Sequence, residues 1–326
     1  MSALYVIGNG FDSAHNLKTS YWFFREYLKK YAENFYIRLE ENYGFYQIDI
    51  DDYHNGPNPQ KALKRRDEYV YDVFWKTIEE KLGYVNETSM LDFSQSIVDA
   101  LDLESGPVGI QDTLDDYWEE QYSFINELQD YVFKWAKQIR LNKCIPLCNE
   151  LVENKDDIFL NFNYTNTLEK VYNIPPSNVL HIHGGLPAYC GIKPILGHGN
   201  YDAIKKCKKQ IENAERVFDE ASISIYNAIA DFYKSTLKDT KKILLFNSGF
   251  FNRLANIDTV KVIGHSLGKV DHPYFKKILD SIDKNSEWFV YYYKSEEEYI
   301  FEKEMLELGV NKDKLHVLHS NEFWKV

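Results

Sequence analysis

The N-terminal stretch of this chain joins a short apolar strand pattern to two glycines one residue apart. Leu4-Tyr5-Val6-Ile7 is followed at once by Gly8-Asn9-Gly10. An apolar run that ends at glycine is typical of a buried strand and a tight turn whose backbone can lie against a ligand. We expect a helix to open near Thr19 and Ser20, so that backbone N–H groups and a helix N-terminus point the same way, as in phosphate-binding turns.

This turn differs from the dinucleotide-binding fingerprint G-x-G-x-x-G in its third glycine position, which holds Ser13. The fingerprint also requires an acidic residue on a second strand about 20 residues further on, whereas Phe24 to Lys30 has a helical pattern. A plain strand, turn and helix without a ligand therefore stays open as an alternative, unless other loops converge on the glycine turn.

The composition excludes several classes of protein. The 326 residues carry a formal net charge of −12, which argues against wrapping of nucleic acid, because phosphate contacts require a basic surface. No apolar run approaches the roughly 20 residues of a membrane span, and the first strand begins too early for a secretory signal. The 4 cysteines form no C-x-x-C pair. We therefore expect a cytoplasmic protein with no bound metal, no membrane contact and no general nucleic-acid binding.

The order of strand and helix patterns predicts an α/β fold. Five further strand patterns follow the first, at residues 158–162, 179–183, 260–264, 288–293 and 315–318. Strands separated by helices indicate a mostly parallel sheet with helices on both faces. Residues 20–140 are predicted to form a large all-helical insertion domain, with one long helix at 113–139. Residues 1–19 and 141–326 then form the sheet domain, with a helical excursion at 200–240.

Glycine or polar residues follow four of these strands where each ends. They are Gly8-Asn9-Gly10 with Asp12, then Asn163-Tyr164-Thr165-Asn166, then His183-Gly184-Gly185, and finally Gly264-His265-Ser266-Leu267. Ligands of open α/β sheets bind beyond the carboxyl ends of the strands, and parallel strands place those ends at one edge. The four loops are therefore expected to converge, which favours a ligand-binding role for the glycine turn.

These stretches, taken in order, resemble the motifs of a known fold. Gly8 to Asp12, Asn161 to Glu169, His181 to Gly184 and Ile263 to Leu267 look like the four ordered motifs of the sirtuin-like NAD-binding fold. More closely, the stretch through Tyr21 resembles the AbiH family of bacterial abortive-infection (anti-phage) proteins. The resemblance implies a Rossmann-type, sirtuin-like sheet that binds NAD. For defence relatives it implies hydrolysis of NAD to nicotinamide and ADP-ribose, which makes the protein an NADase.

The resemblance also implies roles for single residues. Asn163 matches the catalytic asparagine and His183 the catalytic histidine. The residues implied to bind the cofactor NAD are Gly8, Asn9, Gly10, Phe11, Asp12, Thr165, Gly184, Gly264, His265, Ser266 and Asp271. Asn9 stands where alanine is usual, and Thr165 where aspartate is common. The zinc cysteines of the protein deacylases are missing, which speaks against deacylation.

The chemistry of NAD cleavage suits these residue types. The nicotinamide–ribose bond breaks through an oxocarbenium-like state, as glycosidic bonds do. A neutral histidine such as His183 can take a proton from water or from a ribose hydroxyl at pH 7. The amide of Asn163 can orient either group, since it has both donors and acceptors.

The same residues have structural interpretations. Asn163 and Asp12 are residue types that cap helices or form turns. His181 shares one face of its strand with His183. We expect His181 to make a structural hydrogen bond, because no third ligand accompanies the two histidines as a metal pair. His183 ends its strand beside two glycines and is the better candidate for a functional residue.

Two other functions stay open. The fold could bind a nucleotide without cleaving it and so gate a partner or a homo-oligomer; a phage-derived trigger is a further partner that the resemblance allows. Gly264 to Gly268 also match the G-x-S-x-G motif of serine hydrolases, with Asp283 and His316 downstream. A nucleophile elbow needs a helix that starts at the serine, whereas the helix signal here begins at Asp271.

Overall fold

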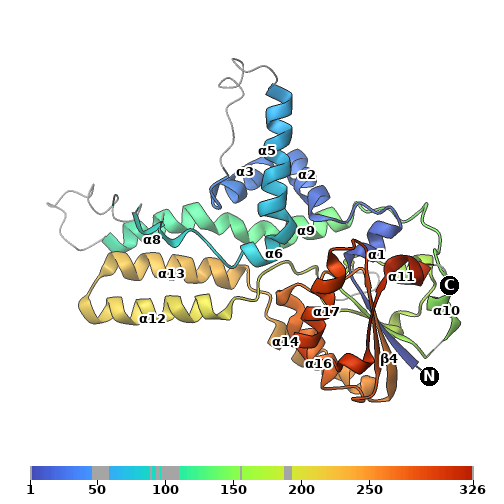
Figure 1. Cartoon of the computed structure of the whole chain (residues 1–326). Coiled ribbons are helices and arrows are strands. Elements are labelled where there is room, and N and C mark those ends of the chain that lie inside the picture. The colour runs from blue at the N-terminus through green and yellow to red at the C-terminus, as the bar shows by residue number, and fades with distance from the viewer. Residues whose placement is uncertain are drawn as a thin grey trace. The chain divides into compact units, whose positions relative to one another are not determined.

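The computed structural model describes residues 2–45, 59–88, 90–92, 96, 110–154, 156–186 and 193–324. Contacts between residues divide the chain into two units, and Figure 1 labels some of their elements. We call them the sheet unit (Met1–Ser20, Val132–Ile195 and Asp239–Val326) and the helical unit (Tyr21–Tyr131 and Leu196–Lys238).

Residues 196–238 group with the helical unit, whereas the sequence predicts residues 200–240 as an excursion of the sheet domain. The reason is that α13 (Glu220–Ser235) packs against both α12 (Tyr201–Val217) and α8 (Ile110–Tyr122). The rings of Tyr122 and Phe232, for example, meet edge to face with centroids 5.9 Å apart. The other boundary lies between residues 131 and 132, inside α9 (Leu128–Ala136), and not at residue 140.

The described residues of the sheet unit form one sheet of six strands. The strands are β1 (Ser2–Ile7), β2 (Ile158–Asn161), β3 (Val179–His181), β4 (Ile257–Ile263), β5 (Glu287–Tyr292) and β6 (Leu315–His319). Their order is β3-β2-β1-β4-β5-β6, and every neighbouring pair is parallel. The predicted α/β class and the parallel sheet are confirmed.

Alternate residues of the central strand β1 belong to the two cores of the sheet unit. Leu4 and Val6 join a core that includes residues of α16 (His272–Leu279) and α17 (Glu297–Leu308). Tyr5 and Ile7 join a second core, built with residues of α1 (Asn9–Ala14), α11 (Thr167–Val171) and α18 (Ser320–Trp324). A strand covered on both faces is apolar throughout, which explains the unbroken apolar run of Leu4 to Ile7 at the end of β1. The predicted helices on both faces are confirmed.

Shorter elements complete the sheet unit. They are α10 (Glu150–Glu153), α14 (Thr240–Phe246), α15 (Ser248–Asn252), η4 (Pro176–Asn178), η5 (Arg253–Asn256), η6 (Lys269–Asp271) and η7 (Lys312–Lys314).

The described part of the helical unit is built from helices. Besides α8, α12 and α13 it contains α2 (Tyr21–Tyr31), α3 (Glu33–Glu41), α5 (Pro59–Val73), η1 (Trp75–Thr77), α6 (Ile78–Lys81) and η3 (Ser123–Glu127). The long helix predicted at 113–139 is therefore interrupted: α8 gives way to the 3-10 turn η3 before α9 begins. Among the described helices, none has both the length and the apolar composition that a bilayer crossing needs.

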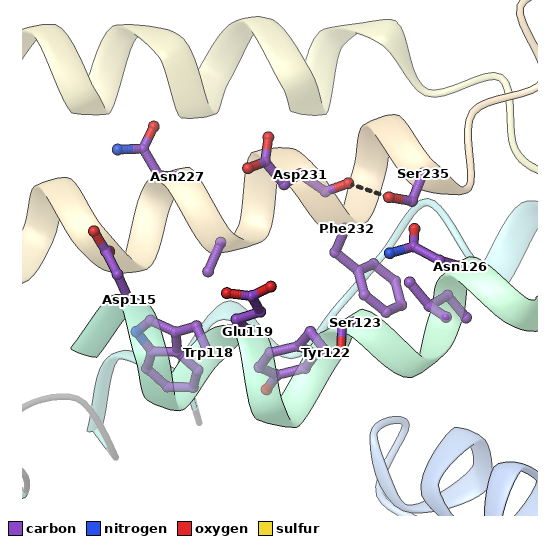
Figure 2. A pocket seen from close by; sticks show the side chains of 12 residues that line it. Asp115, Trp118, Glu119, Tyr122, Ser123, Asn126, Asn227, Asp231, Phe232 and Ser235 are labelled. Atoms are coloured by element: carbon purple, nitrogen blue, oxygen red, sulfur yellow. Dashed lines mark hydrogen bonds between the residues drawn. The ribbon is translucent and has the colours of Figure 1, made fainter. Parts of the chain in front are cut away.

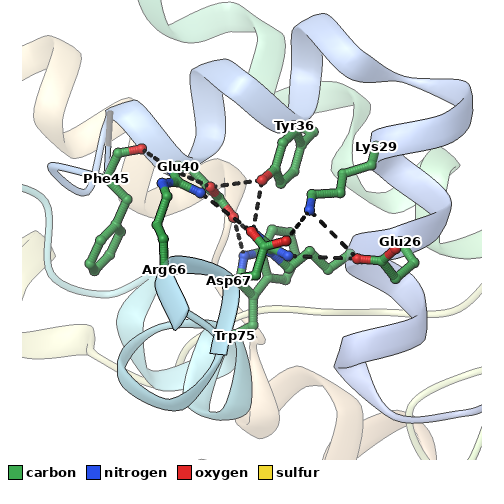
Figure 3. A network of polar contacts seen from close by, with 9 residues as sticks. Glu26, Lys29, Tyr36, Glu40, Phe45, Arg66, Asp67 and Trp75 are labelled. Atoms are coloured by element: carbon green, nitrogen blue, oxygen red, sulfur yellow. Dashed lines mark hydrogen bonds and ion pairs between the residues drawn. The ribbon is translucent and has the colours of Figure 1, made fainter. Parts of the chain in front are cut away.

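A buried ion network ties three helices of the helical unit together (Figure 3). Arg25 on α2 and Glu40 on α3 have no exposed side-chain surface, and Arg25 Nε lies 2.8 Å from Glu40 Oε1. Arg25 Nη2 also lies 2.7 Å from Asp67 Oδ1 on α5. Trp75 Nε1 and the Tyr36 hydroxyl donate to the two oxygens of Glu40, at 2.8 and 2.9 Å. These bonds compensate the burial of both charges, which would otherwise be strongly unfavourable.

Candidate functional site

The ends of four neighbouring strands lie in one row across the sheet. Ile7 of β1 is the partner of Asn161 in β2 and of Ile263 in β4. Asn161 is in turn the partner of His181 in β3. Because the strands are parallel, the loops that follow these residues leave the sheet at the same edge. The structure thus brings together the four loops that the sequence predicts to converge.

The glycine turn after β1 packs backbone to backbone against the loop after β4. Gly8 donates its N–H to Ile263 O at 2.9 Å, and Gly10 donates to Gly264 O at 2.8 Å. A Cβ on Gly10 would lie 2.7 Å from Gly264 Cα, and one on Gly264 would lie 2.3 Å from the nitrogen of Phe11. Gly264 also has a φ of +65°, which residues with a side chain rarely adopt. These glycines therefore allow the backbones of the two loops to approach closely, because a side chain at either position would clash.

Several amides expected to hold a phosphate are used within the protein. Gly8 and Gly10 donate to the β4 end, and Phe11 donates its N–H to Gly8 O at 3.0 Å. A helix opens at Tyr21, next to the predicted position, but the short helix α1 already begins at Asn9. The extended backbone of Gly8 caps α1, so no long turn intervenes between strand and helix. Asn9 and Gly10 are exposed at the sheet edge.

Asp12 is fully buried and joins α1 to the loop after β2. Its Oδ2 accepts from Thr165 Oγ1 at 2.6 Å, and its Oδ1 accepts from Thr167 Oγ1 at 2.8 Å. Burial raises the pKa of Asp12 to about 6, and the two hydroxyls limit that rise. Asp12 and Thr165 therefore hold the loops together, and this arrangement does not offer their side chains to a cofactor as the resemblance implies.

Asn163 connects the loop after β2 to the glycine turn. Its side-chain Nδ2 donates to Gly8 O at 3.0 Å, and its backbone N–H donates to Asn161 Oδ1 at 2.9 Å. The N-cap position of α11 belongs to Asn166, so the interpretation of Asn163 as a helix cap is wrong. Asn163 is buried, with 7% of its surface exposed.

His181 has the structural role that the sequence predicts. Its Nε2 lies 2.6 Å from Glu169 Oε1, and its Nδ1 lies 3.2 Å from Asn163 O. These contacts hold the loop after β2 against the end of β3. Gly184 then turns the chain with a φ of +74°, directly after His183.

Asp271 lies between two histidines that follow different strands. Its Oδ1 is 3.2 Å from Nε2 of His183, and its Oδ2 is 3.4 Å from Nε2 of His265. Both histidine side chains are only 4% exposed, whereas the Asp271 side chain is 14% exposed. The strands concerned, β3 and β4, are not neighbours, because β2 and β1 lie between them. The fold thus brings together three residues that the resemblance singles out, namely two histidines and the carboxylate between them.

A backbone hydrogen bond sets the tautomer of His265. The N–H of Leu267 donates to Nδ1 of His265 at 2.9 Å. A ring nitrogen that accepts carries no proton, so the neutral imidazole has its proton on Nε2. That nitrogen is the one that faces Asp271.

Two aromatic residues that the sequence analysis did not single out enclose these histidines. The ring of Phe162 stands edge-on to His183 and His265, with centroid distances of 4.9 and 4.4 Å. The ring of Tyr274 lies 5.4 Å from that of His183. Both residues read as ordinary core positions in the sequence, and only the fold shows what they touch. Their rings keep water away and so strengthen the electrostatic interactions with Asp271.

Ser266 is exposed, and its surroundings do not fit a nucleophile elbow. Helix α16 begins at His272, not at the serine. His316 lies at the start of β6 and pairs with Glu287, the first residue of β5, at 2.9 Å. Asp283 precedes β5, so it too lies at the opposite end of the strands from Ser266. The arrangement required of a serine hydrolase triad is therefore absent from Ser266, Asp283 and His316.

Two described pockets lie away from the strand ends. One of about 420 Å³ lies over β1 and β4, where Ser2, Tyr5 and Lys261 line it. The other, of about 480 Å³, lies between α8 and α13 and includes Trp118 and Phe232 (Figure 2). Neither is lined by a residue of the four strand-end loops. In the described ranges, no group of three or more histidine, cysteine or acidic residues is placed to hold a metal ion.

Comparison with known protein families matches residues 4–292 to the family described as bacteriophage abortive infection AbiH. No curated protein and no solved structure matches the chain. The matched range runs from β1 to the end of β5. It therefore includes the helical unit as well as the whole strand-end site. Since the match covers most of the 326 residues, the chain belongs to the AbiH family of bacteriophage abortive infection proteins.

Proposed function

We propose that this protein binds NAD at the edge where β1 to β4 end, and hydrolyses it to nicotinamide and ADP-ribose during abortive infection. The strand order β3-β2-β1-β4-β5-β6 supports the proposal, because doubly wound, Rossmann-type dinucleotide-binding sheets have this order. In such sheets the ligand lies where the order reverses, which here is between β1 and β4. The loops at that point carry Gly8 to Gly10 and Gly264 to Ser266.

The exposed groups at this point suit a diphosphate. Asn9 and Gly10 are exposed on the first loop, and Ser266 is exposed on the loop after β4. Lys269, also exposed, adds a positive charge to the second loop. Because the N–H groups of Gly8, Gly10 and Phe11 already donate to carbonyl oxygens, we assign the diphosphate to the side chains of Asn9, Ser266 and Lys269.

His183 is the proposed general base. Its Nε2 lies 3.2 Å from Asp271 Oδ1, outside hydrogen-bond geometry but close enough for the carboxylate to favour a proton on that nitrogen. Nδ1 is then the nitrogen that accepts a proton from water or from a ribose hydroxyl. Asp271 stabilises the imidazolium that results, in the same way as a carboxylate behind any catalytic histidine.

Asn163 is proposed to orient the group that gives up this proton. Its Nδ2 is held by Gly8 O, so the amide plane has little freedom. The amide oxygen can accept a hydrogen bond from water or from a ribose hydroxyl. Because the amide is already held in place, no further conformational entropy is lost when the substrate binds. Correct placement of the reacting groups supplies much of the rate in such reactions.

The observation that carries the proposal is the contact of Asp271 with His183 and His265 at the switch-point edge. Buried carboxylate and imidazole groups are costly to bring together unless they are paired, and they cluster at functional sites. The contact joins loops from the two halves of the sheet.

A second candidate is a module that binds a nucleotide without cleaving it. The observation that favours it is that the side-chain donor of Asn163 and the amides of Gly8, Gly10 and Phe11 all bond within the protein. Such a module would hold NAD intact, and binding would change its association with a partner or a second copy.

The test is to incubate the purified full-length protein with NAD and to quantify nicotinamide and ADP-ribose. Hydrolysis by the wild type, reduced about 100-fold or more in His183→Ala, is the expected result. His316→Ala, which removes an exposed histidine at the other end of the sheet, is the matched control and should keep full activity.

The same quantities are also measured in phage-infected bacteria that express the protein, because the infection supplies a phage-derived trigger if one is needed. NAD that is bound and stays intact in both settings favours the module. Absence of both binding and hydrolysis would contradict the two candidates together.

A further inference from the structure

His265 contacts the protein on both sides of its imidazole ring. In His265, Nδ1 accepts the N–H of Leu267 at 2.9 Å, and Nε2 faces Asp271 Oδ2 at 3.4 Å. Nδ1 of His265 therefore accepts a hydrogen bond from the protein, Nε2 lies beside the Asp271 carboxylate, and the side chain is only 4% exposed. A histidine in these surroundings is poorly placed to exchange a proton with a substrate.

The turn that carries His265 is held from both sides. Leu267 has a φ of +55°, a conformation that costs a β- or γ-branched residue about 1 kcal/mol or more. Its N–H donates to His265, and its carbonyl oxygen lies 3.1 Å from His272 Nε2, which donates to it. Its side chain is buried, with 2% of its surface exposed. These contacts keep the turn in a strained form that presents the His265 ring in one orientation.

We infer that His265 is a positioning residue, which holds Asp271 by one carboxylate oxygen so that the other faces His183. This differs from the direct cofactor contact that the sequence resemblance implies for His265. The consequence for catalysis rests on the proposed function, but the placement of Asp271 and its effect on His183 do not.

Among the described residues, two histidines from different loops lie next to the carboxylate. His183 follows β3 and His265 follows β4, while Tyr274 on α16 has its ring 5.4 Å from that of His183. The ring of Phe162 contacts both imidazoles and is apolar. His272 and Glu304 form a separate pair at 3.3 Å. In the described part of the chain, Asp271 thus lies within ion-pair distance of each of the two histidines.

Two substitutions separate the two contacts of His265. In His265→Asn, the amide oxygen can replace Nδ1 as the acceptor for Leu267, but the side chain is too short to reach Asp271. In His265→Gln, the longer amide can donate to Asp271 as Nε2 does. Both remove the same ring, so a general packing defect affects both and cannot produce a difference between them. Asp271→Asn serves as the reference for complete loss of the carboxylate.

Nuclear magnetic resonance of the full chain, labelled with ¹⁵N-histidine, reports the tautomer and the titration of His183 without NAD. The wild type and His265→Gln are expected to keep His183 with its proton on Nε2. In His265→Asn the tautomer becomes mixed and His183 titrates lower by about half a pH unit, with a larger change in Asp271→Asn. The inference is overturned if His265→Asn matches the wild type, or if Asp271→Asn leaves His183 unchanged.

Kinetics distinguish this inference from the proposed function. If the wild type hydrolyses NAD, His265→Asn should lower kcat about tenfold with KM unchanged, and His265→Gln should restore most of it. A raised KM with kcat retained would show that His265 contacts the substrate, which contradicts a positioning role. If no hydrolysis occurs, the proposed function fails, and the magnetic resonance result alone decides the role of His265.

Discussion

Asp12 shows how burial changes a single acidic residue in the sheet unit. Its carboxylate has no exposed surface and accepts from the hydroxyls of Thr165 and Thr167. Loss of solvation raises its pKa from the ordinary 3.8 to about 6. The folded protein therefore binds this proton more tightly than the unfolded chain does, which makes the residue sensitive to pH between those two values.

Asp12→Asn should remove this pH dependence. In the wild type the stabilisation from protonated Asp12 is complete below about pH 4 and is lost as the pH rises through about 6. The shift of about 2 units corresponds to roughly 3 kcal/mol. Urea unfolding at pH 4, 5, 6 and 7 should show the stability of the wild type falling relative to Asp12→Asn. A difference that is constant over this range would contradict the assignment.

At the scale of elements, three helices of the helical unit depend on one buried ion network. Arg25 from α2 meets Glu40 from α3 and Asp67 from α5, and the first two are fully buried. Such a network stabilises little relative to apolar packing, but loss of one member leaves its partner buried without compensation. It therefore fixes the register of the helices more than it adds to stability.

Arg25→Met should cost about 3 kcal/mol or more in unfolding free energy, because Glu40 would stay buried with fewer partners. Lys64→Met is the matched control, since it removes the same charge from an exposed pair in which Nζ lies 3.8 Å from Glu68. The control should change the stability by less than about 0.5 kcal/mol. Equal effects of the two substitutions in urea unfolding would show that Arg25 acts only through net charge.

The contact between the glycine turn and the loop after β4 is a second element-scale feature. Gly264→Ala would place a Cβ 2.3 Å from Phe11 N at a φ of +65°. We expect a loss of at least about 2 kcal/mol of unfolding free energy and disruption of the strand-end site. Gly249 of α15 has no atom within 4 Å of an added Cβ. Gly249→Ala should instead stabilise by up to about 1 kcal/mol, and a similar loss in both variants would refute this contact.

Local patterns predict much of the sheet unit, but not the contacts between its loops. The apolar run of β1 and its glycines are visible in the sequence, because strand burial and turn geometry depend on adjacent residues. The use of Gly10 to approach Gly264 is not visible, because the two residues meet only after the sheet forms. Asp12 reads as a turn former or ligand for the same reason: its threonine partners lie more than 150 residues away.

At the scale of the whole molecule, the residues of the proposed site all lie in the sheet unit, although the family match includes both units. The chain passes between the units at residues 20/21, 131/132, 195/196 and 238/239. Sequence patterns could not assign residues 196–238, because α13 meets its partner α8 about 100 positions away in the chain. A homo-oligomer and a phage-derived trigger stay predictions.

The central claim is that NAD binds where β1 to β4 end, and histidine magnetic resonance tests it most directly. NAD is titrated into the ¹⁵N-histidine-labelled full chain, and the signals of all histidines are followed. The account predicts saturable shifts of His183 and His265, with His316 at the far end of the sheet and His198 in the helical unit unchanged. Shifts confined to His316 or His198, or no saturable shift of His183, would contradict it.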